Sequence, residues 1–327
     1  FNETGDLLPN VRSLPAFNAE SKIIATVRTN GVLMGQIAPK GGTISGSSSL
    51  VHFDGWNWQD ATVRADEGVY MNWPQRYRQT GWWAEPGPVK TNKKYQASLL
   101  AVHAYFEEAK AYQALTSKHP ENLRFEALTD IIAGTARLYI RANWARDILD
   151  AVQFVRKYEL KKVTIVGGAE AHLVTTELRE NNISVVIDRV HKLPIHPDAP
   201  IDEPYWLAGK LVSEGVLVAF ATNGDMEAML SRNLPFQAGT AVHYGLPYEE
   251  AIRCLTQTPA KLVGVEERYG TLEPGKSATF FISEGDPLDM ITNRVTQAFI
   301  EGKEIDLTNH QTELYHKFSE KHGQKTQ

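Results

Sequence analysis

The sequence is poor in cysteine and contains no long apolar run. Cys254 is the single cysteine among 327 residues, which excludes a disulfide within the chain. No stretch of about 18 consecutive apolar residues occurs, so we expect no membrane span. A net charge of -5 without a basic cluster argues against nucleic acid as a partner. The hydrophobic content of 42% is ordinary for an enzyme-sized globular chain that buries a large core.

The compartment is not decided by the sequence. The chain begins at Phe1 rather than at Met, so we expect a processed or trimmed form whose targeting segment is out of view. A cytoplasmic protein fits this start, and so does an exported one from which a signal segment was removed before Phe1.

Strands and helices alternate from about residue 133 onward, the pattern of parallel βα units. The predicted strands in this part are 137–143, 162–166, 183–188 and 217–221. The predicted helices are 145–158, 170–180 and 205–214, after a long amphipathic helix at 95–117. Earlier in the chain, weaker strand patterns occur at 23–29, 50–53 and 69–73, with a flexible Gly- and Ser-rich loop expected at 41–47.

The stretch 249–303 contains an ordered set of helix, turn and strand signals. A helical period leads to a kink at Pro259 and a C-cap at Gly264. A turn at Pro274-Gly275 then precedes an apolar strand at 278–282, and a second strand follows at 295–300. In this order the stretch resembles the C-terminal signature of the amidohydrolase superfamily, in its imidazolonepropionase-like branch.

The resemblance implies an α/β fold: a metal-dependent (β/α)8 TIM-like barrel with a small C-terminal β-sandwich. We expect the barrel domain at 1–265, the composite sandwich portion at 266–308, and a C-terminal tail or helix at 309–327. The N-terminal sandwich strands, barrel strand one and its His-x-His pair are not seen in this chain. We expect that the missing segment was removed, comes from another chain, or is replaced by a partner, because a barrel lacking one strand exposes two edges.

The resemblance also implies where metal ligands should stand. Relatives that bind zinc use the His-x-His pair, one histidine each after strands five and six, and an aspartate after strand eight. These last three positions fall on Arg141, Gly167 and Asn223. A guanidinium has no lone pair to offer, glycine has no side chain, and an amide is a weak neutral ligand. We therefore expect no metal and no other cofactor in this chain.

Other polar residues near the predicted strand ends could form a rebuilt site. The candidates are Asn143, Glu170, His172, Asp188, Arg189, His191 and Asp225. A Glu/His/Asp cluster could perform acid–base work. The structural alternative is that Glu170 caps the N-terminus of its own helix, His172 packs on that helix, and Asp188 pairs with Arg189.

By resemblance the chain is a hydrolase acting on carbon–nitrogen, non-peptide bonds, and we expect it to be degenerate or non-catalytic. One alternative is an active hydrolase of amides or cyclic amides that uses a rebuilt site. Another is a scaffold or interaction subunit that pairs with a competent paralogue through its tryptophan-rich first quarter. A small-molecule ligand fits these hypotheses, and so does a homo- or hetero-oligomer, dimers being the commonest assembly.

Overall fold

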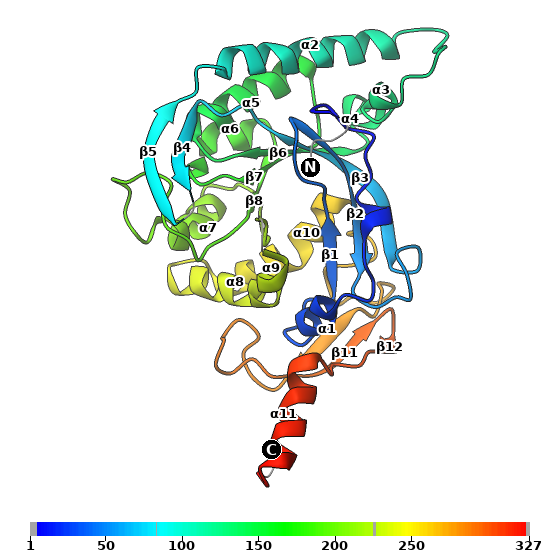
Figure 1. The fold of residues 1–327 in the computed structure, drawn as a ribbon, viewed down its shortest axis with the longest axis vertical. Coiled ribbons are helices and arrows are strands. Elements are labelled where there is room, and N and C mark those ends of the chain that lie inside the picture. Colours follow the sequence, from blue (N-terminus) through cyan, green and yellow to red (C-terminus); the bar gives the residue numbers. More distant parts are fainter. Residues whose placement is uncertain (1–4, 83, 225–226, 325–327) are drawn as a thin grey trace.

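The main body of the protein is a seven-stranded sheet that curls into a half-barrel (Figure 1). The computed structural model describes residues 5–82, 84–224 and 227–324. The strands lie in the order β1-β2-β3-β6-β7-β8-β9. Their bounds are β1 Met34–Ile37, β2 Ile44–His52, β3 Thr62–Asn72, β6 Arg137–Ala142, β7 Val163–Gly167, β8 Ser184–Ile187 and β9 Val218–Phe220.

Five neighbouring strands, β3 and β6 to β9, run parallel to one another. Helices connect them, which confirms the strand–helix alternation predicted after residue 133. These connecting and following helices are α2 Tyr95–Gln113, α3 Leu123–Glu126, α4 Thr129–Ala133, α5 Ala145–Tyr158, α6 Thr175–Glu180, α7 Glu203–Ser213 and α8 Leu234–His243. Short 3-10 turns, η2 Ala171–Leu173 and η3 Glu227–Asn233, precede α6 and α8. The α/β fold with a TIM-like sheet is thus confirmed for this part of the chain.

The first third departs from the prediction. Residues 23–29, predicted as a strand, belong to helix α1 Lys22–Arg28. The Ser21 side chain accepts a hydrogen bond from the Ile23 backbone N–H and starts this helix, and Val27 is buried on its inner face. β1, β2 and β3 then pair antiparallel, so this region is a meander and not a series of βα units.

The predicted Gly- and Ser-rich loop at 41–47 is wrong from residue 44 onward, because residues 44–52 form the fully buried strand β2. Its serine hydroxyls find partners on the neighbouring strand β3. Ser47 Oγ donates to Asp66 at 2.8 Å, and Ser49 Oγ accepts from the Asp66 backbone N–H at 2.9 Å. A serine run can therefore lie inside a sheet when the next strand carries the complementary polar groups.

The largest hydrophobic core lies between the sheet and its helices. Ile140 on β6, Phe154 on α5 and Leu211 on α7 are fully buried there. Cys254 is buried in the same core. A second cluster, centred on Tyr70, Tyr139 and Val166, is separate from this core. None of the helices described is long and apolar enough to cross a membrane.

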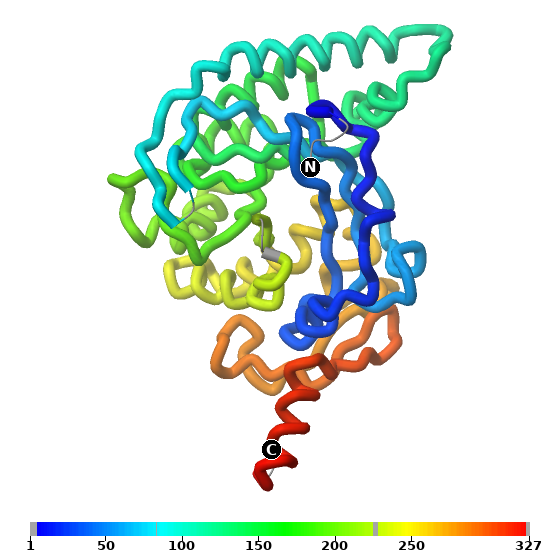
Figure 2. Tube along the Cα trace, in the orientation of Figure 1, coloured from blue at the N-terminus to red at the C-terminus, as the bar shows by residue number. Residues whose placement is uncertain are grey.

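The C-terminal part begins with two helices, α9 Tyr248–Leu255 and α10 Gln257–Val263, and the chain bends between them at Thr256. Gly264 caps α10 with a φ of +70°, as predicted. A separate three-stranded sheet follows, formed by β10 Phe280–Ser283, β11 Val295–Ile300 and β12 Lys303–Glu304. The last helix, α11 His310–Lys321, extends away from the body of the protein (Figure 2).

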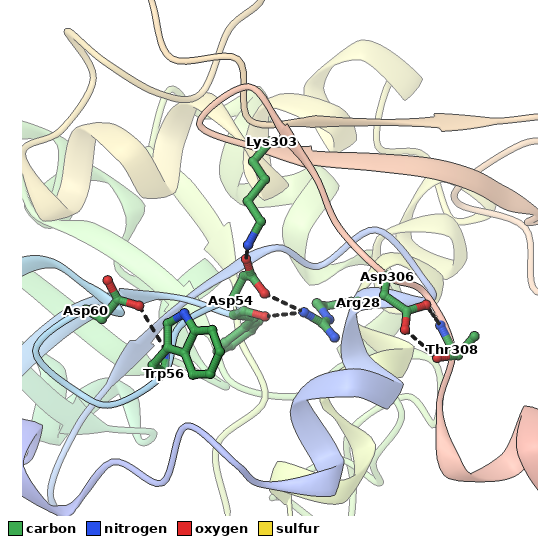
Figure 3. Close-up of polar contacts among 8 residues, drawn as sticks. Arg28, Asp54, Trp56, Asp60, Lys303, Asp306 and Thr308 are labelled. Carbon is green, nitrogen blue, oxygen red and sulfur yellow. Dashed lines mark hydrogen bonds and ion pairs between the residues drawn. The ribbon is translucent and has the colours of Figure 1, made fainter.

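Polar contacts connect this small sheet to the N-terminal region. Asp54 accepts from Arg28 of α1 at 3.1 Å and forms an ion pair with Lys303 of β12 at 3.2 Å (Figure 3). Leu33 packs against Ala298 and Ile300 of β11 in a small apolar cluster. The residue before β1, Leu33, is thus tied to the C-terminal sheet by apolar packing, and Asp54 after β2 is tied to it by charge.

The hairpin of β4 Tyr77–Trp82 and β5 Glu85–Thr91 stands apart as a two-stranded sheet. The early tryptophans do not gather into one surface. Trp56 is 89% exposed, Trp73 is buried in the main core, and Trp82 is exposed on the hairpin. Trp83 lies outside the described residues. The hypothesis of a tryptophan-rich interface therefore gains no support from their placement.

Candidate functional site at the strand ends

The carboxyl ends of the parallel strands share one edge of the half-barrel, and most predicted site residues follow these ends. In α/β barrels this edge is where ligands bind and where chemistry occurs. The register of the sheet places Arg141 of β6 beside Asn72 of β3. The other candidates that the structure describes are Asn143 after β6, Gly167, Glu170 and His172 at and after β7, Asp188, Arg189 and His191 after β8, and Asn223 after β9.

The Arg141 guanidinium is held at this edge by neutral groups. It donates to Ser45 Oγ at 3.3 Å, to Asn72 Oδ1 at 3.5 Å and to the Pro39 carbonyl at 3.1 Å. It also lies 4.5 Å from the centre of the Tyr70 ring, within the range of a cation–π contact. Burial lowers the pKa of Arg141, while the Tyr70 and Asp188 side chains act in the opposite direction. The position predicted for a metal-binding histidine therefore carries a cation.

Beneath Arg141 lies a buried polar network that the sequence prediction missed. Glu67 of β3 is 4% exposed, and its carboxylate accepts from Ser48 at 2.5 Å, from Gln36 and from Tyr139 at 3.0 Å. Burial raises the pKa of Glu67, and these three hydrogen bonds oppose the rise. Tyr70 donates to Gln36 at 2.6 Å and stacks on Tyr139 with ring centres 4.6 Å apart.

Gly167 leaves no room for a side chain at the second predicted ligand position. Its φ of +98° favours glycine, and a Cβ placed there would lie 2.5 Å from the Asn143 Oδ1 atom. The same Oδ1 accepts a hydrogen bond from the Ala169 backbone N–H at 3.3 Å. The Asn143 amide therefore fills the space that a ligating side chain at position 167 would enter.

Glu170 stabilises a helix, but not the one that we predicted. Its carboxylate accepts from the Ala145 backbone N–H at 2.8 Å, at the first residue of α5. The expectation that it caps the helix following it is wrong, because the chain turns after β7 and brings this carboxylate to the start of α5. A negative charge at a helix N-terminus is favourable, so Glu170 has a structural role.

His172 and His191 take different partners. The His172 ring packs edge-on against Trp206 of α7, with centres 5.1 Å apart, a partner that the sequence did not indicate. His191 shares a hydrogen bond of 2.7 Å with Thr240 of α8. Burial lowers the pKa of both rings, which favours the neutral imidazole near pH 7.

Asp188 pairs with Lys192 at 3.0 Å, whereas we predicted Arg189 as its partner. The Arg189 Nε atom instead donates to the His191 carbonyl at 3.0 Å. Lys192 lies four residues beyond Asp188 in the loop after β8, and its ammonium group reaches back to the carboxylate. Asp188 is still near enough to Arg141 to affect its pKa.

Asn223 follows β9 and its backbone N–H donates to the Asp188 carbonyl at 3.3 Å. Its amide offers a neutral oxygen where relatives are expected to supply a carboxylate. Asp225, the candidate nearest to Asn223, lies outside the described residues. The described strand ends therefore combine a guanidinium, amides and two carboxylates that already have partners, Asp188 with Lys192 and Glu170 with the Ala145 N–H.

This set of donors does not fit a catalytic zinc ion. Zinc in such sites needs three or four imidazole, thiolate or carboxylate donors around one point. Among residues 5–82, 84–224 and 227–324, no group of three or more His, Cys, Asp or Glu side chains converges to hold a metal. An open groove of about 370 Å³ lies between α1 and the start of α11, and none of the predicted site residues lines it.

Comparison with known proteins supports the predicted ancestry. The family model for the amidohydrolase family matches residues 92–305, about two thirds of the chain. The chain belongs to the amidohydrolase family. An imidazolonepropionase from Flavobacterium psychrophilum is 25% identical over 240 residues, which confirms the imidazolonepropionase-like branch. An amidohydrolase from Thermotoga maritima MSB8 has the same fold, with a TM-score of 0.78 at 24% identity over 93% of this chain and 80% of that one.

The curated relatives are longer than the part of them that this chain matches. The match covers 65% of this chain and 58% of the Flavobacterium imidazolonepropionase. Amidohydrolase tasK from Hapsidospora irregularis is 25% identical over 189 residues, which are 56% of this chain and 19% of that protein. What the whole relatives do is therefore not carried over as a property of this chain.

Proposed function

We propose that this amidohydrolase-family chain does not perform metal-dependent hydrolysis of carbon–nitrogen bonds with its own residues and acts as a ligand-binding or subunit-type relative. The observation that carries the proposal is the Arg141 guanidinium, which occupies the position where the resemblance implies a histidine ligand. A fixed cation at the strand ends repels a divalent metal and offers it no lone pair.

Two further positions support the same conclusion. At Gly167 the Asn143 amide fills the space of the second histidine. At Asn223 an amide replaces the carboxylate that would accept a proton from a metal-bound water. Losing one group that orients a metal ligand weakens affinity by about 10–100-fold. Replacing several ligands at once removes the site itself.

The main competing hypothesis is an active hydrolase with a rebuilt acid–base site. The contacts of the described candidates weigh against it. Glu170 is engaged at the start of α5, His172 packs on Trp206, and Asp188 pairs with Lys192. A general acid or base has to reach a substrate proton, and these three groups are committed to separate structural contacts.

Turnover assays on the purified chain test the proposal. Amides and cyclic amides are incubated with protein that was first treated with a chelator and then supplied with zinc, with an imidazolonepropionase as the positive control. We expect no zinc-dependent product formation from this chain. Turnover that needs zinc, stops with chelator and persists in Arg141→Gln would contradict the proposal. Turnover that is independent of metal but lost in Glu170→Gln or Asp188→Asn would instead support the rebuilt site.

A further inference from the structure

Arg141 carries a positive charge that no acidic side chain among the described residues neutralises directly. Its three hydrogen-bond acceptors, Ser45, Asn72 and Pro39, are all neutral. Over the described ranges of the chain, it takes part in no ion pair. A partly buried cation without a counter-charge is unfavourable, and binding an anion relieves that cost.

The acidic group that acts on the pKa of Arg141, Asp188, does not supply that counter-charge. Asp188 affects the pKa of Arg141, but its carboxylate is paired with Lys192 at 3.0 Å. The two members of this pair are each about one fifth exposed, so the pair is well formed and locally neutral. The edge of the sheet around Arg141 therefore keeps a net charge of about one positive unit from these three groups.

The guanidinium is also held in position before any ligand arrives. Tyr70 lies under it, and the Tyr70 hydroxyl is fixed by Gln36 at 2.6 Å. Gln36 in turn donates to Glu67, which also accepts from Tyr139, the residue that stacks on Tyr70. A binding group whose support is fixed loses less conformational entropy when the ligand binds.

The charge and shape of the site favour a carboxylate. A planar guanidinium fork matches the two oxygens of a carboxylate, and one cation is balanced by one negative charge. A phosphate dianion would need a second cation, and the Asp188 carboxylate nearby would repel its excess charge. The Gly-rich segment 41–47 adds no phosphate loop, because its residues from Ile44 onward belong to strand β2.

We propose that Arg141 binds the carboxylate of a small organic acid at the strand ends, with Tyr70 as the platform that positions the guanidinium. The site needs no metal, so this inference goes beyond the proposed function and does not depend on it. The two proposals can fail separately, because the proposed function concerns turnover with zinc and the present inference concerns carboxylate binding without a metal.

The test uses ¹⁵N-labelled full chain in chelator at constant ionic strength. Propionate is titrated while the arginine Nε–H signals and the thermal midpoint are followed, and inorganic phosphate and chloride serve as comparison anions. We expect saturable shifts of the Arg141 signal with propionate and affinity at least about 10-fold weaker in Arg141→Gln, because a charge-assisted bidentate contact is lost. Arg78→Gln, on the exposed face of β4, makes the same change in net charge and should bind as the parent does.

Arg141→Lys separates binding from folding. It keeps the charge but loses the planar fork, so we expect a folded protein with weakened propionate binding. Tyr70→Phe keeps the ring but loses the hydrogen bond to Gln36, and a modest weakening is expected. Equal responses to propionate in the parent, Arg141→Gln and Arg141→Lys would overturn the proposal. Binding of phosphate or chloride as tight as that of propionate would overturn the carboxylate assignment.

Discussion

Asp147 gives the protein a pH dependence of stability that one substitution should remove. It lies in the first turn of α5, its side chain is 2% exposed, and its two oxygens accept from the Arg76 backbone N–H at 3.3 Å. Burial raises the pKa of Asp147 from 3.8 to about 6, against the effect of the Arg76 N–H and guanidinium. Nearby Asp150 and Glu170 add to the rise.

The direction of this pH dependence follows from whether the folded or the unfolded state binds the Asp147 proton more tightly. Below about pH 4 the carboxyl is protonated in both states and contributes no penalty. Between about pH 4 and pH 6 the unfolded chain ionises first, so the free energy of unfolding falls as the pH rises. Above pH 6 both states are ionised and the loss is complete. The difference between 3.8 and about 6 corresponds, at 1.36 kcal/mol for each pH unit, to about 3 kcal/mol.

Asp147→Asn keeps an oxygen that can accept from the Arg76 N–H but removes the ionisation. As the pH rises from 4 to 7, we expect the free energy of unfolding of the variant to increase by about 3 kcal/mol relative to that of the parent. Urea unfolding at four pH values measures this difference, and Asp198→Asn, whose side chain is 92% exposed, is the control. A stability difference between parent and Asp147→Asn that stays constant over this range, or changes in the opposite direction, would refute the reasoning.

Substitutions at Gly167, Asn143 and Glu170 test the structure of the strand ends. Gly167→Ala should destabilise the protein by about 1–3 kcal/mol, because it forces a side chain into a φ of +98° and against Asn143. Adding Asn143→Ala to this variant should recover part of the stability that is lost in thermal unfolding. A Gly167→Ala variant as stable as the parent would contradict the assigned backbone. Glu170→Ala should lower the free energy of unfolding by about 1 kcal/mol, because it removes the acceptor of the Ala145 N–H at the start of α5, and Glu170→Gln should lower it less. Equal urea midpoints for both variants and the parent would count against this cap.

The second half of the fold could be predicted because its local patterns agree with its packing. The predicted helix 145–158 coincides with α5, and the predicted strand 295–300 coincides with β11. Apolar periodicity and turn residues carry enough information when each strand is followed by its own helix. The limits of the predicted domains stay a prediction.

The first third could not be predicted in the same way. Residues 23–29 are rich in β-branched side chains, yet Ser21 caps them into helix α1. The serines of β2 resemble a loop in composition, and only their partners on β3 explain why they are buried. Such pairings depend on residues distant in sequence, which local propensity does not contain.

The candidate site was predicted in location but not in its contacts. Arg141, Gly167 and Asn223 lie at the expected strand ends. The roles of Glu170 and Asp188 were wrong, because each finds a partner set by the turn geometry after its strand. The network around Glu67 was missed altogether, because its partners Gln36, Ser48 and Tyr139 are distant from it in sequence.

The central claim is that Arg141 occupies the position of a metal ligand, and diffraction at the zinc absorption edge tests it most directly. Crystals of the full chain are soaked in zinc and an anomalous difference map is calculated around the ends of β6, β7 and β9. We expect no anomalous peak among Arg141, Gly167 and Asn223, with the guanidinium density over Tyr70. A well-occupied zinc ion bound there by protein side chains would contradict it.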